Sequence, residues 1–177
     1  MEWKRSGSPW RKLGDVLQAL LEAGADPNAS CPLVALGIGR SGVPKWRGSA
    51  SRATALLWLT AFDTREEAQI LLDAGADPDI ADENGITPLM VAAQKCLRPM
   101  LCLLLANGAN VHAAEPEHGH TALHCACSRG NADIAEALLR TGADPNHATG
   151  NGETPLMVAA ATGHLQVLHL LLDWGAE

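Results

Sequence analysis

Apolar residues along this chain gather in pairs of short blocks, and polar stretches separate one pair from the next. The first block of a pair is built from small and apolar residues, as in Pro88–Ala93, and the second is rich in leucine, as in Ile134–Leu139. A glycine such as Gly130 or Gly163 breaks the chain between two blocks. The stretches between pairs carry Asp-Pro-Asn and Asn-Gly-Glu, which favour turns. The pattern therefore predicts pairs of helices joined by polar loops.

The pairs recur with a fixed period. A Thr-Pro-Leu or Thr-Ala-Leu triplet opens each pair at Thr54, Thr87, Thr121 and Thr154, with spacings of 33, 34 and 33 residues. A Gly-Ala dipeptide follows each of these threonines 21 residues later, and a further copy lies at Gly24. Because two independent markers share one period, the sequence indicates a repeat architecture.

The same markers predict where the helices begin and end. Threonine caps helices well, and proline at the next position suits the first helical residue, whose N–H group has no intrahelical partner. Glycine after the second block has the usual C-terminal capping role. Helix pairs are expected at 54–74, 87–107, 121–141 and 154–174, after a lone second helix near 9–23. One such pair cannot bury its apolar face alone, so the pairs are expected to stack.

The 33-residue period and the Thr-Pro-Leu opening resemble the ankyrin-repeat family, over about residues 13–177 apart from one insertion. The resemblance implies an all-α fold, namely an ankyrin-repeat solenoid of about four and a half stacked helix-turn-helix pairs with projecting hairpin loops. It also implies a non-catalytic protein–protein interaction scaffold or adaptor that binds partners through its hairpin tips and concave helix face. The family often has a histidine after Thr-Pro-Leu, bonding within the repeat. Here only His124 occupies that place, and Leu57, Met90 and Met157 fill the others.

Carrying the family's binding surface over by register assigns fourteen candidate partner-binding residues. They are Glu83, Asn84, Ile86, Gln94, Lys95, Glu117, His118, His120, Ser128, Arg129, Asn151, Glu153, Ala161 and Thr162. Their mixture of carboxylates and imidazoles favours a partner protein with a basic or polar surface, and it predicts pH-dependent binding between about pH 6 and 7. The resemblance further implies two candidate sites of asparagine hydroxylation, Asn28 and Asn146.

A basic insertion within 31–53 adds about 18 residues between the first Gly-Ala pair and Thr54. Residues 1–53, which include a basic N-terminal segment at 1–12, carry a net charge of +4, whereas residues 54–177 carry −11. The candidate anion-binding residues of the insertion are Arg40, Lys45, Trp46, Arg47 and Arg52. They either contact an anion such as RNA, a phosphopeptide or lipid, or form a solvated loop. The overall charge of −7 argues against nucleic acid as a general partner.

The insertion admits two further interpretations. Gly37–Gly42 matches the GxGxxG dinucleotide pattern, but no helical apolar stripe follows it and no βαβ unit surrounds it, so nucleotide binding is not expected. A helix beginning at Cys31 is an alternative to one beginning at Thr54. The 21-residue spacing of the two markers favours Thr54.

Catalytic and metal chemistry are not predicted. The chain has no HExxH, GxSxG or GxxxxGK[ST] motif. His112, His118 and His120 lie near two cysteines along the chain, but Cys125 and Cys127 fall on small apolar positions of a predicted first helix, where cysteine behaves as a small hydrophobe. The expectation is therefore no enzyme, no cofactor and no metal site.

Composition adds limits on the core and on location. Five Trp, one Phe and no Tyr predict an aliphatic core. Five cysteines, an odd number, favour free thiols in a reducing, intracellular compartment, cytoplasmic or nuclear. No apolar run approaches the ~20 residues of a transmembrane helix.

The last predicted helix, 164–174, is strongly apolar with no polar capping repeat after it. The chain is thus expected to be part of a longer protein, and to be a monomer unless that face is covered. An alternative function is the targeting or regulatory arm of a larger enzyme.

Overall fold

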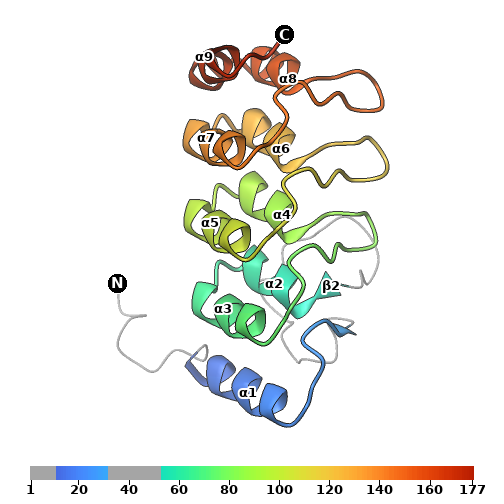
Figure 1. Cartoon of the computed structure of the whole chain (residues 1–177), viewed down its shortest axis with the longest axis vertical. Coiled ribbons are helices and arrows are strands. Elements are labelled where there is room, and N and C mark those ends of the chain that lie inside the picture. Colours follow the sequence, from blue (N-terminus) through green and yellow to red (C-terminus); the bar gives the residue numbers. More distant parts are fainter. Residues whose placement is uncertain (1–10, 32–52) are drawn as a thin grey trace.

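Helices in the computed structural model occur in the pairs that the sequence pattern predicts. The structure describes residues 11–31 and 53–177, where a lone helix, α1 (Arg11–Glu22), precedes four pairs. The first helices of the pairs are α2 (Ala55–Ala61), α4 (Pro88–Gln94), α6 (Ala122–Arg129) and α8 (Pro155–Thr162). The second helices are α3 (Arg65–Asp73), α5 (Arg98–Ala106), α7 (Ala132–Arg140) and α9 (Leu165–Asp173). The all-α stack of helix pairs is confirmed (Figure 1).

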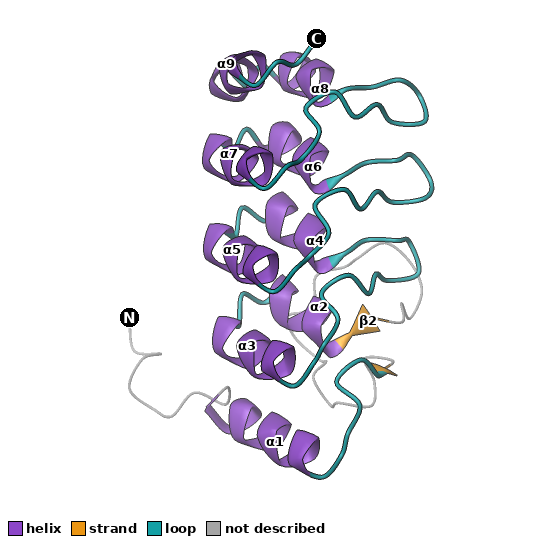
Figure 2. Cartoon of the chain, viewed as in Figure 1, coloured by secondary structure: helices purple, strands orange, loops and turns teal. Residues whose placement is uncertain are grey.

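The pairs form two layers with the loops on one side. The first helices lie beside the projecting hairpin loops, and the second helices form the layer away from them (Figure 2). Within the first layer α2 contacts α4, α4 contacts α6 and α6 contacts α8, while α1, α3, α5, α7 and α9 contact one another in the same order. Among the described residues, no helix is long and apolar enough to cross a membrane.

The sequence markers begin and end the helices as predicted. The side-chain oxygens of Thr54, Thr87 and Thr154 accept hydrogen bonds from the backbone N–H three residues on, at 3.3, 3.3 and 3.4 Å. Proline is the first residue of both α4 and α8. Gly130 and Gly163 end α6 and α8 in the left-handed conformation, with φ of 68° and 75°. This conformation turns the chain directly into the second helix of the same pair.

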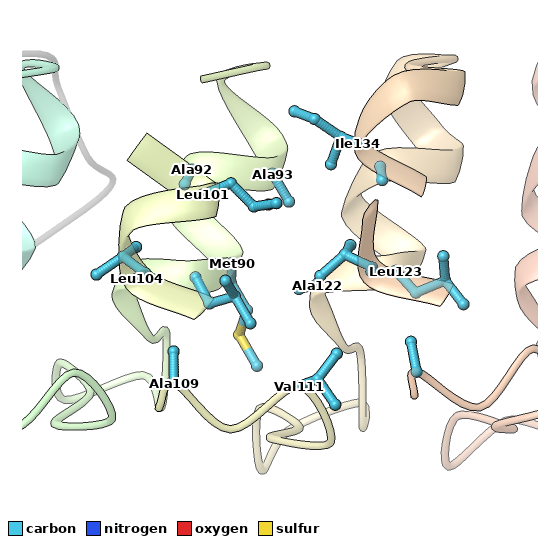
Figure 3. Close-up of a cluster of buried hydrophobic side chains, with 14 of the residues drawn as sticks. Met90, Ala92, Ala93, Leu101, Leu104, Ala109, Val111, Ala122, Leu123 and Ile134 are labelled. Atoms are coloured by element: carbon cyan, nitrogen blue, oxygen red, sulfur yellow. The ribbon is translucent and has the colours of Figure 1, made fainter. Parts of the chain in front are cut away.

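Aliphatic side chains fill the space between successive pairs (Figure 3). Five of the larger ones are at most 1% exposed: Met90, Leu101, Leu104, Leu123 and Ile134. Alanines of the first helices are buried as well: Ala92, Ala93, Ala122 and Ala126. Their small side chains allow neighbouring first helices to approach closely. The core is therefore aliphatic, as the composition predicts.

The two ends of the stack expose apolar side chains. Val16 and Leu20 of α1 are 52% and 49% exposed. In the last pair Met157 and Leu165 are 55% and 68% exposed, and Trp174 after α9 is 42% exposed. An internal repeat has a neighbour on both sides, whereas a terminal one has a neighbour on one side only.

The insertion begins and ends at a short antiparallel ladder. β1 (Ser30–Cys31) pairs with β2 (Ala53–Thr54), with Ser30 opposite Thr54. Because Thr54 caps α2, the helix beginning at Thr54 is confirmed. A helix beginning at Cys31 would run into residues 32–52, which lie outside the described residues. Gly37–Gly42 and all the candidate anion-binding residues lie outside the described residues: Arg40, Lys45, Trp46, Arg47 and Arg52.

Side chains in the turns after the second helices connect one repeat to the next. The Asn28 amide donates to the Gly75 carbonyl at 3.4 Å and accepts from the Asp77 N–H at 2.7 Å. At the other end of the stack, Asn146 makes the same two bonds, with the Gly175 carbonyl at 3.1 Å and the Glu177 N–H at 2.8 Å. Both candidate hydroxylation sites are therefore held in bonds between repeats, and their modification stays a prediction.

Gly130 and Gly163 allow a matched test of how closely the pairs pack. A Cβ on Gly130 would lie 2.4 Å from Nδ1 of His164, whereas one on Gly163 would meet nothing within 4 Å. Gly163→Ala should lower the free energy of unfolding by about 1–2 kcal/mol through backbone strain alone. Gly130→Ala should lower the free energy of unfolding by about 1–3 kcal/mol more than Gly163→Ala does, since the His164 ring must move. Urea unfolding measures both, and equal losses would contradict the packing described. A His164→Ala background should remove the difference.

Candidate partner-binding surface

The fourteen candidate partner-binding residues lie in two rows at opposite ends of the first helices. The tip row, in the hairpin loops, consists of Glu83, Asn84, Ile86, Glu117, His118, His120, Asn151 and Glu153. The helix-end row, where α4, α6 and α8 end, consists of Gln94, Lys95, Ser128, Arg129, Ala161 and Thr162. Because these helices have seven or eight residues, the helices alone separate the rows by about 10–12 Å. The sequence predicts a single binding surface, but the structure divides it into two rows. The glutamates lie in the tip row, and Lys95 and Arg129 lie in the helix-end row.

The tip row presents one exposed glutamate in each of three successive tips: Glu83, Glu117 and Glu153. Ile86 and His120 are half-buried. Ile86 packs against the buried side chains of Leu57 and Val91, so it supports the tip from below as well as bordering the surface. The acidic character expected of the candidate surface is therefore concentrated in this row.

The helix-end row borders an open pocket of about 500 Å³. The residues that line it come from three successive repeats: Ala61, Phe62, Asp63, Gln94, Lys95, Cys96, Leu97 and Arg129. The Lys95 ammonium donates to the Ala61 carbonyl at 2.7 Å, which joins two neighbouring repeats. Lys95 therefore has an internal role that its place in the sequence did not indicate.

Four imidazoles form a continuous row from the tip between α5 and α6, through α6, to the tip between α7 and α8. Ring centroids are 5.6 Å apart for His118 and His120, 5.6 Å for His120 and His124, and 5.8 Å for His124 and His147. His124 bonds within its own repeat, since its Nδ1 lies 2.9 Å from Oγ1 of Thr121 and accepts from the Thr121 N–H at 3.3 Å. Its Nε2 lies 3.3 Å from the Glu153 carbonyl in the next tip. This histidine therefore connects two repeats.

A buried carboxylate, Glu115, holds the same tip together. It is 7% exposed, and its oxygens accept from the backbone N–H groups of Glu117, His118 and His120 at 2.8, 2.9 and 3.2 Å. Nδ1 of His120 also lies 3.1 Å from Oε1. Sequence reasoning missed Glu115. A one-residue gap would have aligned it with Asp82, which bonds two N–H groups of the preceding tip.

The environment of this tip shifts two pKa values. Burial raises the pKa of Glu115, but the N–H groups of His118, His120 and Glu117, with the His120 imidazole, together lower it to about 2. Burial lowers the pKa of His124, and the bond to the Glu153 carbonyl only partly opposes this effect. At neutral pH the tip therefore combines an ionised, fully bonded carboxylate with a buried neutral imidazole.

The cysteines near these histidines do not share their site. Burial raises the pKa of Cys125 to about 11 and that of Cys127 to about 12, so both thiols stay protonated at neutral pH and are poor nucleophiles and metal ligands. Glu115 takes their place beside His118 and His120. These three residues each offer a ligand atom, and the atoms all lie within 4.8 Å of one another.

Comparison with protein-family models matches residues 11–115 and 98–177 to ankyrin repeats, in a model that holds three copies. The chain belongs to the ankyrin-repeat family. The ankyrin match includes α1 and all four helix pairs, so it covers the whole described stack. The resemblance inferred from the 33-residue period and the Thr-Pro-Leu opening is confirmed.

Curated relatives of this ankyrin-repeat chain are longer proteins. Ankyrin repeat domain-containing protein 63 of Homo sapiens is 43% identical over 112 residues, which cover 59% of this chain and 29% of that protein. The B-cell lymphoma 3 protein homolog of Mus musculus is 37% identical over 65% of this chain and 26% of its own length. The putative palmitoyltransferase ZDHHC13 of Danio rerio is 34% identical over 62% of this chain and 17% of its own length. The chain therefore spans less than a third of each of these relatives.

Glu115 should contribute to the stability of the ankyrin stack in an acid-sensitive way. Its folded pKa of about 2 lies below the ordinary 4.5, so its contribution is present above pH 4.5 and is lost as the pH falls toward 2. Glu115→Gln should lower the free energy of unfolding at pH 7 by about 1.5–3 kcal/mol, the range for hydrogen bonds to a charged group. The variant should also lose less stability than the wild type between pH 4.5 and 2. Urea unfolding across this range tests it, and parallel profiles would contradict the role assigned to Glu115.

His124 predicts a second pH dependence, near neutrality. Its folded pKa lies below the ordinary 6.5, so its contribution is complete above pH 6.5 and declines as the pH falls below that value. His124→Met introduces the residue that stands at the equivalent places, Met90 and Met157. We expect this variant to lose less stability than the wild type between about pH 7.5 and 5.5. His112→Met, at an exposed position, is the control and should follow the wild type.

Proposed function

We propose that this chain is a non-catalytic scaffold whose hairpin tips bind a basic segment of a partner protein, with the concave face of the first helices beside them. Ankyrin repeats are generally protein-interaction modules. The observation that carries the finer proposal is the row of exposed glutamates at 83, 117 and 153, one in each of three successive tips. A series of carboxylates fixed on a repeating frame complements a chain with spaced lysines or arginines.

Contacts between tips favour a pre-formed binding edge. The Gly150 N–H donates to the His118 carbonyl at 2.6 Å, and Nε2 of His147 lies 3.2 Å from the Gly119 carbonyl. The preceding pair of tips is equally close, because a Cβ on Gly85 would lie 2.1 Å from Cδ of Pro116. A partner that binds such an edge does not have to order it first, and this lowers the cost of association.

The helix-end row suggests the polarity of the bound partner. Arg129 and Lys95 border the pocket at the far end of the first helices, beyond the acidic tips. A partner with basic residues over the tips and polar or acidic residues over the far ends of the first helices would match both rows. The two rows would therefore orient the partner as well as attract it.

Charge reversal at the tips tests the proposal. We expect Glu83→Lys, Glu117→Lys and Glu153→Lys together to weaken partner binding by at least about tenfold, because like charges across an interface cost several kcal/mol. The matched control combines Glu22→Lys, Asp73→Lys and Asp173→Lys, which make the same charge change in the last turns of α1, α3 and α9. Quantitative affinity capture from cells, followed by titration of each recovered protein with purified chain, gives the affinities.

The comparison of the two triple variants decides the outcome. Partners that are lost with the tip variant and kept with the control support the proposal. Partners that survive tip reversal but are lost with the control would place the binding surface on the second helices and contradict it. Circular dichroism on both variants checks that the stack is intact.

A second candidate role is the targeting or regulatory arm of a larger protein. This role is favoured because the chain spans only a small share of each of its longer relatives. One of these relatives is named as a putative palmitoyltransferase. In that case the same tips would bind the substrate or regulator, and the chemistry would lie elsewhere. We further propose a reducing, intracellular location. The free thiols of Cys96, Cys102, Cys125 and Cys127 in the described residues support this location.

A further inference from the structure

We propose that the tip formed by residues 115–120 is a zinc site, with Glu115, His118 and His120 as ligands and Glu153 as an outer partner. This inference rests on different observations from the proposed partner binding, although both use His118, His120 and Glu153. It rests on the way four side chains from two successive tips converge. The ligand set differs from the cysteine-containing one considered in the sequence, because the carboxylate that completes it comes from a residue that sequence reasoning did not single out.

The distances between the ligand atoms fit a tetrahedral ion. Bonds of about 2.0–2.1 Å from zinc to nitrogen and oxygen place neighbouring ligand atoms about 3.3–3.4 Å apart. Oε1 of Glu115 lies 3.4 Å from Nδ1 of His118 and 3.1 Å from Nδ1 of His120. Both distances from Oε1 to the imidazole nitrogens therefore match those around a bound ion, and all three ligand atoms lie within 4.8 Å of one another.

The backbone holds these ligands in place without the ion. The N–H groups of Glu117, His118 and His120 fix the Glu115 carboxylate. Gly119 lies between the two histidines at φ 85°, and its own N–H donates to the Glu115 carbonyl at 2.9 Å. The resulting tight turn brings the two imidazole centroids to 5.6 Å. A site formed in this way loses little conformational freedom when an ion binds.

Glu153 supplies the partner that a ligating histidine usually has behind it. Oε2 of Glu153 lies 3.7 Å from Nε2 of His120, the ring nitrogen that faces away from Glu115. A carboxylate at this position favours the tautomer with hydrogen on Nε2, which leaves the Nδ1 lone pair for the metal. Binding would replace the present contact between His120 Nδ1 and Glu115 Oε1 by two bonds to one ion.

The exposure of the histidines and the types of ligand atom both favour a zinc ion. The side chains of His118 and His120 are 49% and 39% exposed, so an ion can reach them from solvent. Three protein ligands leave a fourth tetrahedral position for water. Two imidazoles with one carboxylate suit zinc better than magnesium or calcium, which prefer oxygen ligands.

Calorimetric titration of the full, untagged chain with Zn²⁺ near neutral pH tests the site. Thiols accessible in the folded chain are alkylated first, so that cysteine does not contribute. We expect one ion per chain. His118→Asn and His120→Asn should each weaken binding by more than tenfold, and Glu153→Gln by about tenfold, the lower end for an outer-sphere partner. His112→Asn, outside the cluster, should bind like the wild type.

Nuclear magnetic resonance shows where the ion binds, independently of the affinity that calorimetry measures. Long-range ¹H–¹⁵N spectra of the imidazoles should show Nδ1 of His118 and His120 bound to the metal, with His112 and His169 unchanged. Absence of binding by calorimetry would overturn the proposal. Binding that persists in the His118→Asn/His120→Asn double variant would overturn it as well, because the ion would then lie elsewhere. Circular dichroism of each variant establishes that a loss of binding is not a loss of fold.

Discussion

Contact between neighbouring repeats is the constraint on which this structure depends. The helices from α2 to α9 have only seven to nine residues, whereas an isolated helix is marginal below about 12–15 residues. Each is therefore stable only when its apolar side is buried against the next repeat. Leu101, Leu104 and Ile134 are completely buried in this way, and the alanines of the first helices keep the layers close. The same contacts set the hairpin tips side by side, so the candidate surface is a product of the stacking.

Much of this fold was predictable because its information is local and repeated. The threonine caps, the prolines after them and the left-handed glycines each act on a few residues of their own repeat. The fixed interval from Thr54 to Gly75 was sufficient to choose between two registers for α2, although about 18 extra residues precede it. Periodicity averages such signals over four copies, which makes a single irregular repeat easy to recognise.

The candidate site was only partly predictable, because its decisive contacts depend on departures from the repeat. The 34-residue interval between Thr87 and Thr121 places one more residue in the tip, and the bonded carboxylate lies six rather than five residues before the threonine. Glutamate there is one methylene longer than Asp82, which lets it reach three N–H groups in place of two. Lys95 likewise has a partner, the Ala61 carbonyl, 34 residues away, and no local pattern indicates it.

The ladder of β1 and β2 has a consequence for how the chain can change over time. It fixes Ser30 and Thr54 opposite each other, so the two ends of the inserted segment are held at one place. When the two ends of a segment are already held together, doubling its length costs only about 0.6 kcal/mol in closure entropy. Additional sequence can therefore be gained or lost at this position while the spacing of every following repeat stays the same. The ladder separates the evolution of the inserted segment from that of the scaffold that carries it.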